Sequence, residues 1–394
     1  INRFYSHGLA KKIGPRHLPE RYPLMFPRNE IHMKVMVAKM SLLLGILLVQ
    51  NACGADWSQF RGPLGNGHAT DANPPLLWNA KENITWRVVL PGQGWSSPVI
   101  SGEHIYLTAA VPAAEGFSLR AIGLDAGSGK TLWSTEIFSQ SGMAPAIHGK
   151  NSHASPTPVL VDDRLYVHFG HQGTACLDLK GKIIWKTRQI DYSPVHGNGG
   201  SPIVAGGKLI FSVDGANKTF IVALDTRDGS EVWRRQRESE ATRKFSFSTP
   251  VAVDVDGRTQ IISPGTDVVH ALDLEDGSVI WHARYDGYSV IPRPVFGHGM
   301  IYITTGYGAP SVLAIAVDGT GDVTDTHIRW RTQRGAPHTP SLLLVKDELY
   351  MVSDRGVASC LDARTGEPHW QERVGAAYSA SPVFASGRIY LMSE

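Results

Sequence analysis

One short pattern recurs through the chain and constrains its fold more than any other feature. Leu-Asp is followed by a glycine-containing turn and then by a strand that ends in tryptophan. Five copies end at Trp133, Trp185, Trp233, Trp281 and Trp370, and a sixth, VDGTGDVTDTHIRW, keeps an aspartate and Trp330 around an enlarged turn. Successive tryptophans lie 52, 48, 48, 49 and 40 residues apart. Self-similarity at this period indicates a repeat architecture.

A second marker, a proline followed by an aliphatic strand, recurs in phase with the first, at Pro98, Pro158, Pro202, Pro250, Pro294, Pro340 and Pro382. Each copy precedes a turn and a strand such as RLYVHFG or RIYLMSE, so each unit contains four short strands. One such unit cannot bury both of its faces, whereas radial packing of several units does so. The sequence therefore predicts an all-β fold, a β-propeller of four-stranded antiparallel blades that forms one domain over residues 56–394.

The repeated aspartates and tryptophans are predicted to be structural, because each recurs at one register instead of gathering at one place. The glycine between them supplies a hairpin turn, and the tryptophans are expected to pack between blades. These repeat positions are Asp125, Trp133, Asp178, Trp185, Asp225, Trp233, Asp273, Trp281, Trp330, Asp362 and Trp370.

The number of blades follows from the units that the chain contains. Six units lie between Trp86 and Trp370, and a seventh begins at Ser381 and stops at Glu394. NITWRVVL, around Trp86, has the character of a tryptophan strand without its three preceding strands, which predicts that the N-terminus closes the ring. We expect eight blades, with seven as the alternative, and a chain that is truncated within its seventh blade.

Residues 33–55 have the layout of a secretory signal peptide. Lys34 and Lys39 precede an apolar run of ten residues, Met40 to Val49, and small residues follow. That run is shorter than the roughly 20 residues that a membrane-spanning helix needs. We expect cleavage after Ala55 and a periplasmic or secreted protein; the alternative is a lipoprotein anchored to a membrane at Cys53. Residues 1–32 precede Met33 and are predicted to be a non-native upstream extension.

The charge of the chain depends on that leader. The whole sequence has 38 basic and 36 acidic residues, and its first 55 residues hold eight basic and two acidic ones. Subtracting them leaves 30 basic against 34 acidic residues. A mature chain that is slightly acidic gives no reason to expect a nucleic-acid partner.

The repeat resembles the tryptophan-docking repeat of quinoprotein alcohol dehydrogenases, which belong to the pyrroloquinoline-quinone (PQQ)-like propeller superfamily. The resemblance covers about Asp56 to Glu394. Four stretches are similar to a narrower bacterial family of secreted propellers, the BamB-like proteins: WSQFRGPLGNG, KNSHASPTPV, GNGGSPI and GDVTDTHIRW. This second resemblance implies a non-catalytic scaffold that contacts other envelope proteins through its loops. The long segments 111–117, 139–153, 188–200 and 234–245 are the expected loops.

The first resemblance implies an adjacent cysteine pair over the cofactor, calcium-binding carboxylates with an asparagine, a catalytic aspartate and often a CxxCH haem site. Cys53 lies in the leader, and Cys176 and Cys360 precede the Leu-Asp of separate repeats. We therefore expect two buried unpaired cysteines and neither haem nor PQQ. Asp318, Asp322 and Asp325 in the enlarged turn are weighed as calcium ligands, against a solvated hairpin.

Five histidines form the remaining candidate site: His148, His153, His168, His171 and His196. The second unit and its flanking loops could bring several imidazoles to one end of the central channel, where they would be metal ligands. Their spacing matches no compact zinc motif, and surface histidines are the alternative. The function hypotheses are therefore a scaffold without a cofactor and, as the alternative, a divergent PQQ-dependent dehydrogenase or metal-dependent enzyme.

Overall fold

The computed structural model describes residues 56–70, 72–141 and 146–394. The predicted upstream extension, the signal peptide and Cys53 lie outside these residues. No helix in the described part is long and apolar enough to cross a membrane. One short 3-10 helix, Gly170–Gln172, is its only helical element.

The chain from Val99 onward forms six successive sheets, each with four antiparallel strands in chain order, which we number 1 to 6. Sheet 1 contains β2 (Val99–Ser101), β3 (His104–Ala113), β4 (Gly116–Asp125) and β5 (Thr131–Gln140). Sheet 2 contains β6 (Val159–Val161), β7 (Arg164–His168), β8 (Thr174–Asp178) and β9 (Ile183–Thr187). Sheet 3 contains β10 (Ile203–Ala205), β11 (Lys208–Asp214), β12 (Thr219–Asp225) and β13 (Glu231–Gln236).

The next three sheets repeat this plan with one addition. Sheet 4 contains β14 (Val251–Val255), β15 (Arg258–Pro264), β16 (Val268–Asp273) and β17 (Val279–Arg284), and β21 (Gly321–Asp322) adds a parallel fifth strand beside β17. Sheet 5 contains β18 (Val295–Gly297), β19 (Met300–Thr304), β20 (Val312–Ala316) and β22 (Ile328–Thr332). Sheet 6 contains β23 (Leu343–Val345), β24 (Glu348–Val352), β25 (Val357–Asp362) and β26 (Pro368–Arg373).

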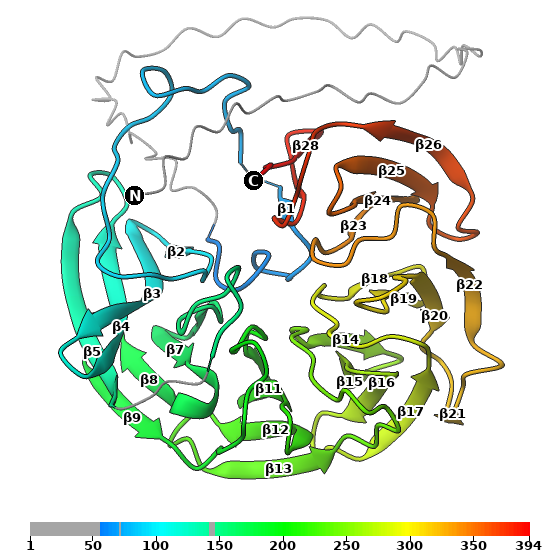
Figure 1. The fold of residues 1–394 in the computed structure, drawn as a ribbon, viewed down its shortest axis with the longest axis horizontal. Helices are drawn as coiled ribbons and strands as arrows, with labels where there is room; N and C mark the ends of the chain where they lie inside the picture. Colours follow the sequence, from blue (N-terminus) through cyan, green and yellow to red (C-terminus); the bar gives the residue numbers. More distant parts are fainter. Residues whose placement is uncertain (1–55, 71, 142–145) are drawn as a thin grey trace, which may run out of the picture.

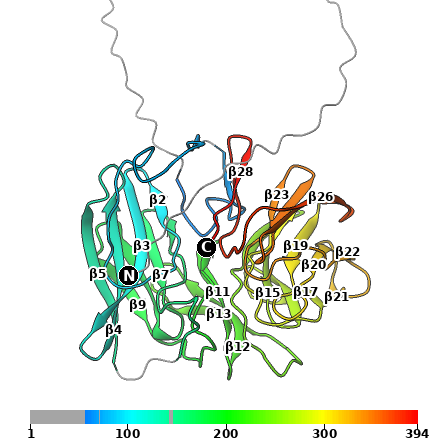
Figure 2. The ribbon, with the colours of Figure 1, turned by 45° about the horizontal axis from the view of Figure 1, so that its top comes forward.

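Sheet 7 joins the two ends of the described chain. The N-terminal strand β1 (His68–Ala69) pairs in parallel with β27 (Val383–Ala385), which pairs with β28 (Arg388–Tyr390). Figures 1 and 2 show the sheets following one another around a common axis, with the first strand of each sheet innermost. The predicted all-β propeller fold of four-stranded antiparallel units is confirmed. The number of blades and the closure of the ring stay predictions.

The hydrophobic core consists of clusters between neighbouring sheets. Sheets 4 and 5 share a cluster that includes Ile262, Trp281 and Leu313, and sheets 2 and 3 share one that includes Trp185, Phe211 and Val222. Every residue from Thr219 to Leu224 in β12 is buried, because β12 lies in the middle of its sheet and a neighbouring sheet covers each of its two faces. Each sheet is therefore stabilised by the next, as expected for a repeat protein.

The repeated aspartates cap the turn between the third and fourth strands. Asp125 accepts hydrogen bonds from the backbone nitrogen of Ser128 at 2.7 Å and from its hydroxyl. Hydrogen bonds from Ser128 lower the pKa of the Asp125 carboxyl. Asp178 and Asp362 accept backbone N–H groups two residues further along in the same way. This side-chain turn explains why aspartate begins each hairpin.

The tryptophans contact the hairpin of the following sheet. The Trp133 indole donates to Leu179 O at 2.9 Å, and Trp185, Trp233 and Trp330 make the equivalent bond to Thr226, Leu274 and Ala363. Each ring also covers the turn glycine of that hairpin. A Cβ atom added to Gly181 would lie 2.6 Å from the Trp133 ring, and Gly181 has a φ of 84°. Only glycine suits a position with both a left-handed φ and an overlying ring.

Two tryptophans depart from this pattern. Trp86 was predicted to lie in a strand, and that prediction was wrong: residues 84–90 form none. Trp86 still makes the docking contact, because its indole donates to Ala126 O at 2.8 Å and covers Gly129. Trp281 instead donates to Gln260 in its own sheet at 2.9 Å, because the enlarged turn of sheet 5 supplies β21 at this place.

Two further details of the sequence interpretation were wrong. In sheet 6 the position of the strand-initiating proline is taken by Leu342, so the marker at Pro340 lies two residues too early. Thr339-Pro340-Ser341 imitates the marker but belongs to the preceding loop. The expected loop at 111–117 is mostly a continuation of β3 and β4, which pair as far as Ala113 and Gly116.

Candidate functional site

A belt of hydroxyl groups links the innermost strands around the axis. In sheets 1, 2, 3, 5 and 6, the residue two positions before the first strand donates its backbone N–H to the side-chain hydroxyl at the same position in the next sheet. The bonds run from Ser97 to Thr157, Thr157 to Ser201, Ser201 to Thr249, Arg293 to Ser341 and Ser341 to Ser381, at 2.9 to 3.0 Å. These bonds explain the serine or threonine in the repeated marker, and Arg293 alone interrupts the hydroxyl series.

The segment 57–69, which we call the strap, contacts the inner strands of five sheets. Trp57 exchanges two backbone hydrogen bonds of 2.9 Å with Ile100 in sheet 1, and Ser58 O accepts Leu160 N of sheet 2 at 2.8 Å. At its other end, Gly67 O accepts Phe384 N of sheet 7 at 2.9 Å. The motif WSQFRGPLGNG therefore lies along the inside of the propeller, a role that the sequence did not reveal.

Two buried arginines fasten the strap to sheets 5, 6 and 7. Arg61 donates to Leu342 O at 2.7 Å and to Pro382 O at 3.4 Å. Arg293 donates to Phe60 O and to Gln59 Oε1, and a Cβ added to Gly65 would lie 2.2 Å from its guanidinium. Burial lowers the pKa of both side chains to about 9, so both remain charged at neutral pH. Their bonds go to neutral oxygens, which makes them structural clamps.

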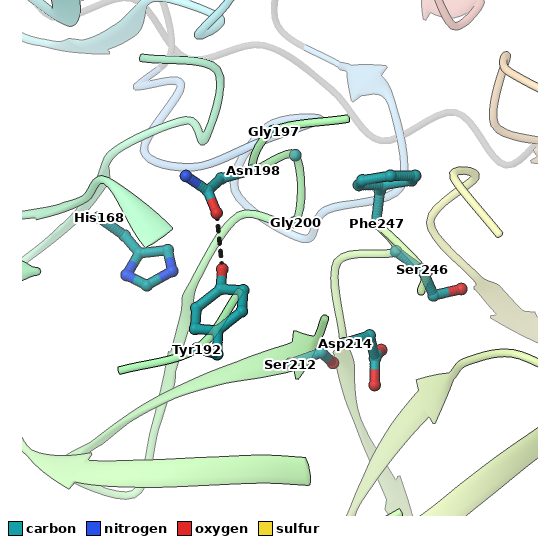
Figure 3. A pocket seen from close by; sticks show the side chains of 11 residues that line it. His168, Tyr192, Gly197, Asn198, Gly200, Ser212, Asp214, Ser246 and Phe247 are labelled. Carbon is teal, nitrogen blue, oxygen red and sulfur yellow. Dashed lines mark hydrogen bonds between the residues drawn. The ribbon is translucent and has the colours of Figure 1, made fainter. Parts of the chain in front are cut away.

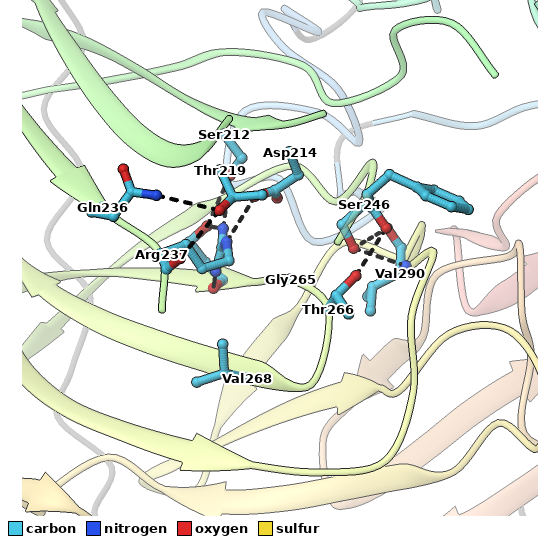
Figure 4. Close-up of polar contacts among 12 residues, drawn as sticks. Ser212, Asp214, Thr219, Gln236, Arg237, Ser246, Gly265, Thr266, Val268 and Val290 are labelled. Atoms are coloured by element: carbon cyan, nitrogen blue, oxygen red, sulfur yellow. Dashed lines mark hydrogen bonds and ion pairs between the residues drawn. The ribbon is translucent and has the colours of Figure 1, made fainter. Parts of the chain in front are cut away.

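A buried ion pair lies between sheets 3 and 4. Arg237 Nε donates to Asp214 Oδ1 at 2.8 Å, and neither side chain is exposed to solvent (Figure 4). The guanidinium also donates to Ser263 O at 2.8 Å and to Ser263 Oγ at 2.7 Å. The second carboxylate oxygen, Asp214 Oδ2, is buried without a hydrogen-bond partner among the described residues. Burial raises the pKa of Asp214, and the charge of Arg237 opposes that rise.

A small polar cavity lies beside this ion pair, lined by Asp214, Ser246, His168, Tyr192 and Asn198 among others (Figure 3). Tyr192 donates to Asn198 Oδ1 at 2.7 Å, and Asn198 in turn donates to Phe169 O at 3.2 Å. The cavity has a volume of about 10 Å³, which is room for about one water molecule. It can hydrate buried polar groups but cannot hold an organic cofactor.

The five candidate histidines occupy different surroundings. The exposed rings of His148 and His196 lie 5.8 Å apart. His153 is buried against Phe117, and His168 lies 4.2 Å from the Phe211 ring with its Nδ1 2.8 Å from Thr174 Oγ1. His171 contacts Asn198. Within the described ranges, no group of three or more His, Cys, Asp or Glu side chains is placed to hold a metal ion.

Two buried histidines should make stability depend on pH. Burial lowers the pKa of His168 and of His270 to about 3; Arg237, His282, Arg284 and Arg235 add to the effect at His270. An unfolded histidine has a pKa of about 6.5, so below that pH the unfolded chain binds more protons and stability falls as pH falls. Each histidine is expected to remove roughly 2 kcal/mol of unfolding free energy between pH 7 and pH 5.

His270→Leu tests this expectation, because His270 Nδ1 is buried without a partner in the described structure. Urea unfolding at pH 7 and pH 5 should show a loss in the variant that is roughly 2 kcal/mol smaller than in the wild type. His104→Leu, at an exposed position, is the matched control and should leave the pH dependence unchanged. Equal pH dependence in His270→Leu and wild type would contradict the assignment.

The residues present do not fit PQQ. Cys176 and Cys360 are free and buried, at equivalent positions of sheets 2 and 6, so they do not form the adjacent pair that the resemblance implies. A pocket for a drug-sized ligand or cofactor has a volume of roughly 300 to 1,000 Å³, whereas the polar cavity beside the ion pair has about 10 Å³. A groove of about 450 Å³ lined by Phe296 and Asp318 is large enough, but neither cysteine lines it. No catalytic step through this cofactor follows from the structure.

The aspartates of the enlarged turn have separate partners. Asp322 accepts the Thr324 backbone N–H at 2.9 Å and lies 3.6 Å from His282, whereas Asp318 lies 3.6 Å from His327. Each of these two carboxylates thus contacts a partner within the turn or beside it. The described residues resemble a capped hairpin, and Asp318, Asp322 and Asp325 do not form a group that could hold a calcium ion.

Known proteins are similar to this chain in sequence and in fold. The chain is 22% identical over 337 residues to outer membrane protein assembly factor BamB of Yersinia pestis, which covers 81% of this chain and 72% of that protein. It is 23% identical over 261 residues to BamB of Moranella endobia (strain PCIT), covering 63% and 61%. The crystal structure of BamB from Moraxella catarrhalis is similar with a TM-score of 0.54 and 16% identity, covering 80% and 82%.

A europium-containing methanol dehydrogenase shares the fold with a TM-score of 0.50 and 10% identity, covering 84% of this chain and 87% of that one. The repeated sheets, the docking tryptophans and these likenesses define a propeller of the PQQ-like class. Residues 71–212, 120–343 and 321–394 match the family model described as outer membrane protein assembly factor BamB. The chain belongs to this family.

Proposed function

We propose that the protein is a non-catalytic interaction scaffold of the bacterial envelope, which binds other envelope proteins through its propeller loops. Membership of the BamB family and the assembly role in the relatives' names support this proposal. The observation that carries it concerns the interior of the propeller. The strap and the buried arginines pack there against the inner strands, and the polar cavity of about 10 Å³ has room for only about one water molecule. The exposed loops are therefore the surfaces available to a partner.

Localisation is part of the same proposal. The pattern of residues 33–55 supports export and a periplasmic or secreted location for the region from Asp56. Membrane attachment through Cys53 is the alternative. Mass spectrometry of the N-terminal peptide from exported protein would separate a free Asp56 from a lipid-modified Cys53.

Site-specific photo-crosslinking tests the scaffold function. A crosslinker at Lys244, in the loop between β13 and β14, should yield adducts with other envelope proteins in cells that produce the chain. Asp256, in the turn between β14 and β15 at the opposite end of the sheet, is the control; both positions are exposed. Adducts from Lys244 alone support the proposal. Equal adducts from both positions, or none from Lys244, would contradict it.

The alternative, a divergent PQQ-dependent dehydrogenase or a metal-dependent enzyme using the histidines of the second unit, has a direct test. We expect purified protein incubated with PQQ and Ca²⁺, or with Zn²⁺, to retain no stoichiometric quinone or metal after gel filtration. Stoichiometric retention of either would favour the enzyme.

A further inference from the structure

Six aromatic rings follow one another across the connections between strands. Consecutive ring centroids lie 5.8, 5.3, 5.8, 5.7 and 5.1 Å apart. We call this set the aromatic arc, and in order its members are His148, His196, Phe245, Tyr288, Tyr307 and His338.

The topology places the whole arc on one face of the propeller. Five members lie in connections from the last strand of one sheet to the first strand of the next, and Tyr307 lies between β19 and β20. In a four-stranded antiparallel unit, both kinds of connection leave from the same end. The arc therefore crosses the ends of several successive sheets, although neighbouring members are as many as 49 residues apart in sequence.

Main-chain hydrogen bonds hold these loops to one another. His148 N donates to His196 O at 3.1 Å, Ser289 N donates to Phe245 O at 3.0 Å, and Tyr307 N donates to Tyr288 O at 2.7 Å. The rings are thus ordered before any partner binds, which lowers the entropic cost of binding.

The arc is accessible and carries both positive charge and hydrogen-bonding groups. Tyr307 is 55% exposed, and His148 and His196 are also exposed. The Arg243 guanidinium lies 5.1 Å from the Tyr288 ring centroid and donates to its hydroxyl at 2.6 Å. Lys244 is exposed next to it.

This face offers side chains to a partner instead of a strand edge. Inside the propeller, the strap already pairs with the inner strands at Ile100 and Phe384, so strand addition is blocked at those places. Rows of aromatic rings with nearby hydrogen-bond donors recognise polyproline II segments, whose carbonyl groups are unpaired and whose conformation is already extended.

We propose that the aromatic arc binds a proline-rich extended segment of a partner protein, with an acidic residue of that segment beside Arg243 and Lys244. The inference rests on the proposed scaffold function and names the chemistry of the partner. The rings supply apolar contact, and the two cations fix the direction of the segment.

Calorimetric titration of the purified protein with a synthetic peptide of ten prolines, flanked by glutamates, tests the proposal. Tyr307→Ala should weaken binding about tenfold, because exposed aromatic residues at such surfaces carry much of the binding energy. Phe296→Ala is the matched control, since Phe296 is 38% exposed and lines a groove of about 450 Å³ at the opposite end of the sheets. The same peptide with lysine flanks should bind more weakly.

Undetectable binding of either peptide, or equal weakening by Tyr307→Ala and Phe296→Ala, would overturn the inference. Displacement of the proline peptide by a β-linked N-acetylglucosamine oligomer with higher affinity would assign the arc to a glycan instead. Adding Tyr307→Ala to the Lys244 crosslinking experiment distinguishes the scaffold function from binding at the aromatic arc. Loss of the adduct supports partner binding at the arc. An undiminished adduct supports the scaffold function and rejects the arc as the binding site.

Discussion

Asp214→Asn is expected to lower the free energy of unfolding by about 3 to 5 kcal/mol, because it leaves a buried guanidinium without its counter-charge. Arg237 would then keep only neutral partners, Ser263 and Ser212, at a place without solvent contact. Urea unfolding followed by circular dichroism measures the loss. The exposed pair of Asp191 and Lys218, 3.7 Å apart, gives the control: Asp191→Asn should change little.

The double variant Asp214→Leu, Arg237→Met separates the ion pair from the packing around it. Replacing both buried charges with apolar groups of similar size is often tolerated, so the double variant should recover most of the stability that the single variant loses. A double variant that is less stable than Asp214→Asn would show that the charges themselves stabilise this interface.

Trp281→Ala is expected to cost about 3 to 5 kcal/mol, the range for removing a large buried aromatic side chain. Trp281 is fully buried in the cluster between sheets 4 and 5, and its loss also leaves Gln260 Oε1 without its 2.9 Å donor. Trp370→Ala, at the same repeat position but only half-buried, should cost less than half as much.

Equal losses in the two tryptophan variants would show that the repeat position, and not burial, determines the contribution. Because propeller repeats can unfold without full cooperativity, the urea midpoints should be compared by both circular dichroism and tryptophan fluorescence.

The sequence predicted what depends on local periodicity. Alternating aliphatic residues, aspartate-capped turns and a tryptophan at one register specified the four-stranded units, because those interactions form within a hairpin or with the next one. The errors arose where one unit imitates another. Pro340 carries the marker sequence two residues before the true strand, and Trp86 keeps the docking contact without a strand around it.

The site was less predictable because its residues meet across connections of unequal length. Histidines at positions 148 to 196 suggested a single cluster, but burial separates His168 beside Phe211 from the exposed pair of His148 and His196. No sequence spacing relates Phe245, Tyr288 and Tyr307, so the aromatic arc could not be found from the sequence. The sequence held one signal of the contact between Arg293 and the strap. A serine or threonine recurs at the same position before the first strand of the other sheets, and Arg293 replaces it in sheet 5.

The strap also sets an order of events during synthesis. Arg61 contacts Leu342 and Pro382, which lie 281 and 321 residues further along the chain. At ~5 to 20 residues per second, a ribosome needs roughly 15 to 60 seconds to make the last of these partners after Arg61 itself. Throughout that interval Arg61 lacks these two acceptors, while sheets 1 to 4 can already pack against one another. The strap precedes sheets 1 to 6 in the sequence and is nevertheless among the last segments to complete its contacts.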